Sequence, residues 1–281
     1  MPIFSSPQYS SDIYEYPAHL RDQAAAAPAA PGVYLFYAEH GGMPLYIGKS
    51  VNIRSRLLAH LRNEGEARML RHARRIEFQC TAGEISALLK ESRLIKELQP
   101  LYNKRLRLNR RLCSLLLHDG LITFVDTSSL IGRARLFGLF RSRRAATDAI
   151  VQLADLHGLC LVSIGIEKPT GRPCFRAQLR KCRGACTGAE SLSHHAIRLE
   201  SALEHLQIHQ WPHPGAIALY ERHENLEEYH VVNRWHYLGS YTRLADTKRV
   251  NVFPPPSFDS DCYKILVRPI MDPSSSVIHL S

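Results

Sequence analysis

Two tyrosines occupy matching places in two short apolar segments. Tyr34 lies in Gly32–Tyr37 and Tyr46 in Leu45–Ile47, with turn-forming residues between them over 39–44. The β-branched and aromatic content of both segments predicts the two strands of one hairpin. Because side chains alternate along a strand, both phenols should lie on the same face. Three cations follow on the next loop and on a helix predicted over 51–62: Lys49, Arg54 and Arg56.

Glu91 is a carboxylate on the apolar face of a predicted helix. This helix is expected over 81–99, started by a capping box at Thr81-Ala-Gly-Glu84 and ended by Pro100. Three apolar residues share the stripe of Glu91: Leu88, Ile95 and Leu98. A carboxylate that faces inward needs a cation, a hydrogen bond or a metal ion. Spacing alone does not decide between a salt bridge to Lys or Arg and a metal site.

Four cysteines cluster in a basic segment: Cys160, Cys174, Cys182 and Cys186. Cationic neighbours favour the thiolate, which is the form that binds a metal. Structural zinc sites usually have two close cysteine pairs, whereas only the last pair is close here. An irregular set of four suits a 4Fe–4S cluster at least as well, so zinc, iron–sulfur and no metal at all stay open at this point. Three further cysteines stand alone and are expected to be buried small apolar residues: Cys80, Cys113 and Cys262.

The chain has 281 residues and carries 36 Lys and Arg against 26 Asp and Glu, a formal charge of +10. Such an excess attracts polyanions, of which nucleic acid is the commonest. The basic residues gather over 54–75, 104–111 and 172–183. Because no helix-turn-helix or zinc-finger pattern is present, we expect contacts to the DNA backbone and shape. The residues assigned to DNA contact are Arg54, Arg62, Arg71, Arg74, Arg75, Lys104, Arg105 and Arg107.

The apolar residues do not form a run of 18 or more, so no membrane partner is expected. The first 16 residues lack the basic start and apolar stretch of a secretory signal. We therefore expect a cytoplasmic protein, in which seven cysteines argue against a disulfide framework.

The remaining sequence predicts two further units. The middle part alternates strands over 115–117, 121–125 and 136–140 with helices over 145–157 and 189–209. After Pro212 the predicted elements are strands over 216–220, 229–233, 235–238 and 263–267. The chain is thus divided into an N-terminal extension (1–30), a small α/β unit (31–108), a cysteine-containing domain (109–210) and a strand-rich C-terminal region (211–281).

The hairpin resembles the signature of a known nuclease family. Gly32-Val-Tyr34 with Tyr46-Ile-Gly48 is similar to the GIY-YIG motif, with Val in place of the first Ile. Four later features match the nuclease domain of the UvrC excinucleases: Gly48-Lys-Ser50, Arg56, Glu91 and Gln99–Asn103. The resemblance covers 31–103. It implies an α+β fold, with a small antiparallel sheet flanked by helices in the N-terminal GIY-YIG domain, then the cysteine-cluster domain and the strand-rich region.

The resemblance also implies catalytic roles. Glu91 would hold one Mg²⁺ or Mn²⁺ ion, which would polarise the scissile phosphate. Tyr46 would act as the base that activates water, provided that nearby cations make its phenolate accessible. Tyr34 would align the water or the phosphate.

Four more residues belong to the expected catalytic set. Arg56 would stabilise the charge that develops on phosphorus, and Lys49 would assist as a point charge. Asn103 would cap or order the site. His60 is a departure from the pattern, because many family members have a tyrosine at this place close to the catalytic arginine. A histidine can still donate to a phosphate.

The cysteine segment resembles the one that follows the nuclease domain of the UvrC excinucleases, which implies a 4Fe–4S cluster at the four clustered cysteines. The chain shows no second nuclease half, so it resembles a short homologue of those enzymes. This implies one incision on the 3′ side of a bulky lesion, in damaged double-stranded DNA loaded with UvrB. Two other functions stay open: a non-repair, structure-specific GIY-YIG nuclease, and a non-catalytic iron–sulfur DNA-binding protein.

Overall fold

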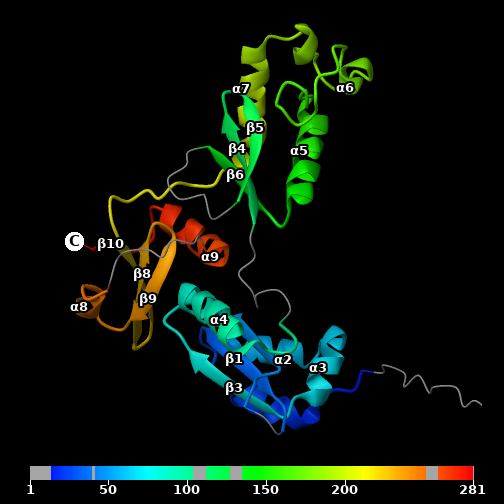
Figure 1. The fold of residues 1–281 in the computed structure, drawn as a ribbon. Coiled ribbons are helices and arrows are strands. Elements are labelled where there is room, and N and C mark those ends of the chain that lie inside the picture. Colours follow the sequence, from blue (N-terminus) through cyan, green and yellow to red (C-terminus); the bar gives the residue numbers. More distant parts are fainter. Residues whose placement is uncertain (1–13, 40–41, 104–111, 127–134, 251–258, 281) are drawn as a thin grey trace, which may run out of the picture.

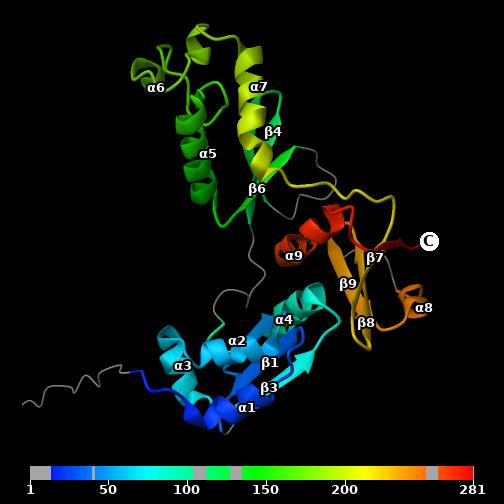
Figure 2. The same cartoon turned by 180° about the vertical axis from the view of Figure 1, so that it is seen from behind.

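The structure is a computed structural model of the 281-residue chain and describes residues 14–39, 42–103, 112–126, 135–250 and 259–280. Within these residues the strands form three antiparallel sheets, each with its own helices (Figures 1 and 2). The α+β architecture predicted from the sequence is therefore confirmed. None of the described helices combines the length and the apolar character needed to cross a bilayer.

The N-terminal unit has a three-stranded sheet in the order β2-β1-β3, with helices on both faces. Its elements are α1 (Arg21–Ala26), β1 (Gly32–Tyr37), β2 (Tyr46–Ser50), α2 (Ile53–His60), α3 (Ala67–His72), β3 (Arg75–Cys80) and α4 (Glu84–Leu98). The central strand β1 is buried along its whole length. Tyr34 and Phe36 pack against α1, α2 and α3, whereas Leu35 and Tyr37 pack against α4. The predicted hairpin and both predicted helices are confirmed, and β2 continues through Gly48 to Ser50.

The middle unit has the strand order β5-β4-β6 and is covered by two long helices. Its elements are β4 (Cys113–His118), β5 (Leu121–Asp126), β6 (Leu136–Phe140), α5 (Arg143–His157), α6 (Phe175–Gln178) and α7 (Leu192–Leu203). Ser142 and Ser191 cap the two long helices with their side chains. Gly158 ends α5 in the left-handed conformation, which glycine adopts without strain. The strands and helices predicted for this unit are confirmed to within a few residues, and α7 ends earlier than expected.

The C-terminal unit has the strand order β10-β7-β8-β9. Its elements are β7 (Ile217–His223), β8 (Leu226–Asn233), β9 (His236–Tyr241), α8 (Leu244–Thr247), α9 (Ser260–Met271) and β10 (Val277–His279). The strand predicted over 263–267 is wrong, because this segment lies inside α9. Tyr263, Leu266 and Ile270 are buried at helical spacing, and the Asp259 side chain accepts the backbone N–H groups of the first turn.

The N-terminus of α4 is not capped as the sequence predicted. Thr81 Oγ1 donates to the carbonyl of Gly83, and the Glu84 carboxylate pairs with Lys49, so no Thr81–Glu84 capping box forms. Instead the Glu221 carboxylate of β7 accepts the backbone N–H groups of Ile85 at 2.9 Å and Ser86 at 2.7 Å. Gly83 leaves the room for this contact, since a Cβ there would lie 2.2 Å from Glu221 Oε1.

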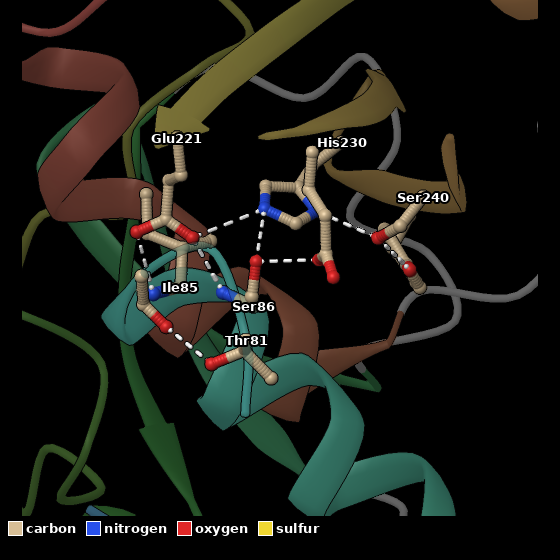
Figure 3. A network of polar contacts seen from close by, with 9 residues as sticks. Thr81, Ile85, Ser86, Glu221, His230 and Ser240 are labelled. Carbon is tan, nitrogen blue, oxygen red and sulfur yellow. Dashed lines mark hydrogen bonds and ion pairs between the residues drawn. The ribbon is translucent and has the colours of Figure 1, made fainter. Parts of the chain in front are cut away.

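A buried polar network surrounds this helix end (Figure 3). The His230 ring, fully buried on β8, places Nε2 2.9 Å from Ser86 Oγ and 3.1 Å from Glu221 Oε2. Its Nδ1 lies 2.6 Å from Ser240 Oγ, and Ser86 Oγ donates to Glu228 at 2.6 Å. Burial alone would raise the pKa of Glu221, but the hydrogen bonds from His230, Ser86 and Ile85 hold that pKa below its usual range.

The other end of α4 is also tied to the C-terminal unit. Lys96 Nζ lies 3.1 Å from Asp259 and 3.4 Å from Asp261 at the start of α9. Between the two ends, Leu89 is buried in the same apolar core as Trp235 and Leu266. Figures 1 and 2 both show α9 beside α4. The helix α4 therefore belongs to two cores at once.

Replacing Glu221 by Gln should destabilise the protein, because the charge that the α4 N-terminus and His230 bind is lost. Hydrogen bonds to a charged group contribute about 1–3 kcal/mol each, so we expect a loss of that order in urea unfolding. Glu224→Gln is the matched control, since Glu224 is exposed at the turn between β7 and β8. Equal stability of the two variants would show that Glu221 does not hold α4.

Candidate active site

An open pocket lies where β2, α2 and α4 meet. Its lining residues are Tyr34, Tyr46, Lys49, Ser50, Val51, Arg56, Glu84 and Glu91. The fold thus brings together five of the seven residues predicted to be catalytic, although they span nearly 60 positions of sequence. His60 lies behind Tyr34, and Asn103 lies against the outer edge of β2.

The two phenols share one face of the hairpin, as predicted. Tyr34 is paired with Gly48 across the strands and Phe36 with Tyr46, so Tyr34 and Tyr46 are diagonal neighbours with ring centroids 6.4 Å apart. Gly48 makes room for Tyr34, because a Cβ at that position would lie 2.3 Å from the Tyr34 hydroxyl. The glycine is thus needed for the close approach of a ring. Burial is the main cause that raises the pKa of both phenols, so both are protonated near neutral pH.

Two cations line the pocket, Arg56 and Lys49. A hydrogen bond with Tyr34 is the main cause that raises the pKa of Arg56 on α2, and the positive charge of Arg56 in turn favours the phenolates of Tyr34 and Tyr46. Lys49 Nζ lies 2.6 Å from Glu84 Oε1. Glu84 was not predicted as a pocket residue, because its place at a predicted helix start suggested a cap.

Glu91 is the half-buried carboxylate of the pocket. Burial raises its pKa to about 7, although the Lys49 ammonium, the Lys49 backbone amide and Arg56 all act in the opposite direction. In the described part of the chain no Lys, Arg or His side chain forms an ion pair with Glu91, and Lys49 pairs with Glu84 instead. The salt bridge that spacing left open is therefore not formed. A carboxylate that is desolvated and unpaired beside an open pocket fits a divalent cation, since hard cations prefer oxygen ligands.

Asn103 acts on the backbone of β2. Its side-chain amide accepts the N–H of Ile47 and donates to the carbonyl of Ile47, both at 2.8 Å. Ile47 separates Tyr46 from Gly48, so this pair of bonds fixes the strand segment that carries the pocket tyrosine. Asn103 does not line the pocket. Asn103 therefore contacts the strand that carries Tyr46, and its expected role of capping or ordering the site stays a prediction.

The arginines expected to contact DNA are exposed: Arg54, Arg62, Arg71, Arg74 and Arg75. Arg74 donates to the backbone carbonyls of Arg71 and Ala73, and Arg75 pairs with Glu77. The other three residues of this prediction, Lys104, Arg105 and Arg107, lie outside the described residues.

The fold brings the four clustered cysteines of the sequence close together. Sulfur atoms of Cys160, Cys174 and Cys182 lie within 4.8 Å of one another, and Cys186 packs against the same cluster. The Cys160–Cys174 and Cys174–Cys182 sulfur distances are 3.9 and 3.6 Å. His195 Nε2 accepts the backbone N–H of Cys160 at 2.9 Å and so fixes this part of the chain. The other three cysteines lie away from the cluster, with Cys262 buried and Cys80 and Cys113 half-buried.

Each of the three units of the chain matches a known protein family. Three family models match most of the chain: the UvrC-like GIY-YIG domain over residues 30–104, the UvrC/Cho excinuclease middle domain over 94–205 and the excinuclease Cho C-terminal domain over 216–281. Excinuclease Cho of Salmonella typhi is 51% identical over 95% of this chain and 92% of its own length. The Escherichia coli K12 protein of that name is 49% identical over the same shares.

This chain belongs to the excinuclease Cho family. Like other members of the excinuclease Cho family it is an endonuclease of excision repair that acts on DNA. UvrABC system protein C of Bartonella henselae is 34% identical over 62% of this chain and 26% of its own length. A crystal structure of the GIY-YIG N-terminal endonuclease domain of UvrC from Thermotoga maritima, bound to magnesium, is 32% identical over 31% of this chain and 97% of that domain, with a TM-score of 0.29. The domain boundaries given above stay a prediction.

Glu91→Gln should stabilise the metal-free protein at high pH. The folded-state pKa of about 7 lies above the usual 4.5, so the contribution of Glu91 to stability is complete below pH 4.5 and is lost as pH rises through 7. We expect the variant to equal the wild type near pH 4 and to exceed it by about 3 kcal/mol near pH 8.

The measurement is urea unfolding of both proteins in the presence of a chelator. Because the two proteins differ only at Glu91, the difference between their free energies of unfolding cancels the contribution of all other titrating groups. Glu97→Gln, on the exposed side of α4, should show no such pH-dependent gain. A constant difference between Glu91→Gln and wild type across this pH range would contradict the assigned burial of the carboxylate.

Proposed function

We propose that the pocket hydrolyses one phosphodiester bond on the 3′ side of a bulky lesion, with one divalent metal ion and in damaged double-stranded DNA loaded with UvrB. The observation that carries this proposal is the half-buried Glu91 carboxylate, which has no ion-pair partner among the described side chains, in a pocket with two phenols and two cations. The remainder of the proposal, the 3′ side and the UvrB dependence, is supported by the family resemblance.

Glu91 would hold Mg²⁺ or Mn²⁺, and the ion would polarise the scissile phosphate and stabilise the leaving oxygen. The guanidinium of Arg56 presents a planar set of donors that suits two oxygens of a phosphate. Lys49 adds a compact positive charge, and its ion pair with Glu84 holds it at the pocket rim. Both cations thus favour the negative charge that grows during hydrolysis.

Tyr46 faces the pocket as the group that takes the proton of the attacking water. Burial and the negative charges of Glu91 and Glu66 raise its pKa, whereas Arg56 and a hydrogen bond with Tyr34 lower it. A protonated phenol can take up a second proton only as it gives away its own. The function of Tyr46 as a base therefore requires a further acceptor behind it.

The exposed arginines of the N-terminal unit support DNA binding through phosphate contacts, which are independent of sequence. We assign this role to Arg54, Arg62, Arg71, Arg74 and Arg75, together with Lys104, Arg105 and Arg107.

We further propose that Cys160, Cys174, Cys182 and Cys186 hold a 4Fe–4S cluster. Three sulfurs converge within 4.8 Å and the fourth cysteine packs beside them. Four cysteine thiolates are the usual ligands of such a cluster. Its role would be to hold the loops of residues 160–186 together and to position DNA, and zinc is the alternative occupant.

The function is tested by a nicking assay. The substrate is an end-labelled duplex with one bulky adduct, incubated with Mg²⁺, with and without UvrB. We expect one UvrB-dependent nick on the 3′ side of the adduct, no nick with a chelator, and loss of the nick in Glu91→Gln but not in Glu97→Gln. A nick that survives Glu91→Gln would contradict the assigned site. If the wild-type protein makes no nick at all, a non-catalytic DNA-binding protein would be favoured.

The cysteine site is tested by metal analysis. Protein purified without oxygen should be brown and contain about four irons per chain, the content of one cluster. Cys182→Ser should lose most of the iron, whereas Cys113→Ser should keep it because Cys113 lies in β4, away from the cluster. A colourless protein with one zinc would replace the iron–sulfur assignment by a zinc site.

A further inference from the structure

A line of hydrogen bonds runs from the pocket into the protein behind it. The hydroxyl of Tyr34 lies 2.6 Å from Nε2 of His60, and Nδ1 of His60 is bonded to the carboxylate of Glu66. Tyr34 and His60 are 1% and 2% exposed, so this line is closed to solvent along its first step. Glu66 had no function assigned from the sequence.

The direction of each hydrogen bond follows from its partners. The Glu66 carboxylate is an acceptor, so Nδ1 of His60 carries the hydrogen and Nε2 keeps its lone pair. Tyr34 must then donate its hydroxyl hydrogen to Nε2. Arg56, which can only donate, bonds to the oxygen of Tyr34 and agrees with this direction.

Glu66 is itself held in place. One of its oxygens bonds to His60 and the other accepts Asn63 Nδ2 at 3.0 Å. Asn63 Oδ1 accepts the backbone N–H of Gly65, so the turn before α3 is tied together at the carboxylate. Glu66 is therefore a fixed partner for the imidazole.

We propose that Tyr34, His60 and Glu66 form a proton relay that receives the proton of the attacking water, with His60 as its final acceptor. This inference rests on the proposed hydrolytic function and adds the route of the proton. Tyr34 touches the pocket, and Glu66 acts as a positioning residue through His60.

The relay balances protons as follows. An O–H bond of the water breaks and its proton goes to the oxygen of Tyr46. The Tyr46 hydroxyl, which is hydrogen-bonded to Tyr34, passes its own proton to the oxygen of Tyr34. The hydroxyl proton of Tyr34 passes to Nε2 of His60. The water oxygen forms its bond to phosphorus as the bond from phosphorus to the leaving oxygen breaks. The leaving oxygen keeps the electron pair of that bond and takes a proton from the solvent. Both tyrosines end neutral, and the one new positive charge is an imidazolium beside the Glu66 carboxylate.

The surroundings of His60 explain why the carboxylate is needed. The imidazole packs against the rings of Tyr34, Phe36 and Tyr46, with centroids 5.3, 5.7 and 5.6 Å away. Of the charged groups, Glu66 bonds to it directly and Arg56 lies one turn earlier on α2. A cation buried among aromatic rings is costly unless an anion pairs with it, and Glu66 supplies that anion.

The test is the single-turnover nicking rate as a function of pH, at saturating Mg²⁺ and with UvrB present. His60→Phe keeps the ring packing but removes the acceptor, and we expect its rate to fall by about 10²-fold, the usual contribution of a positioned base. Glu66→Gln should slow nicking and change the pH profile of the rate, because the imidazolium formed in the transfer loses the carboxylate that pairs with it. DNA affinity should not change in either variant.

Glu64→Gln is the matched control, since Glu64 is an exposed carboxylate of the same turn and should keep the wild-type rate and profile. Thermal unfolding establishes that each variant is folded. A wild-type rate in His60→Phe, or a wild-type profile in Glu66→Gln, would overturn the relay while Glu91→Gln still abolished nicking. Failure of the wild type to nick at all would instead overturn the proposed function.

Discussion

The site depends on one carboxylate at one helix end. Glu221 of β7 accepts two backbone N–H groups at the N-terminus of α4, from a position about 135 residues later in the chain. Helix N-termini favour negative charge, because their first N–H groups have no partner within the helix. Glu91 lies less than two turns beyond this contact. The position of the proposed metal ligand is thus set from the C-terminal unit as well as from its own sheet.

The pocket joins groups whose preferences oppose one another. Burial favours the protonated forms of Glu91 and of both phenols, while Arg56 favours the ionised form of all three and Lys49 that of Glu91. Such a balance leaves the ionisation of the pocket sensitive to any charge that enters, and perturbed groups in a cleft are typical of catalytic sites. The central strand β1 can carry a buried phenol because Gly48 leaves space for its ring.

The sequence predicted most of the features that depend on short-range periodicity. Alternation placed Tyr34 and Tyr46 on one face, helical spacing placed Glu91 on a half-buried stripe, and the irregular cysteine set does converge. What it could not supply were partners that only the folded chain brings near, above all Glu221 at α4. Glu84 was predicted to form a capping box with Thr81, but in the folded chain it pairs with Lys49 instead. The strand predicted over 263–267 was wrong because the β-branched composition of this segment was weighed above the helical spacing of its buried residues.

The contact of Asn103 with β2 has a consequence for the sheet itself. In the described sheet β2 is an edge strand, and an open edge invites another chain to add a strand. The Asn103 amide imitates the backbone of such a neighbour, since it offers one acceptor and one donor to Ile47. A side chain therefore occupies this edge at Ile47, in the hairpin that carries the pocket tyrosines. This protects the sheet from strand addition while leaving the pocket face free for a nucleic acid.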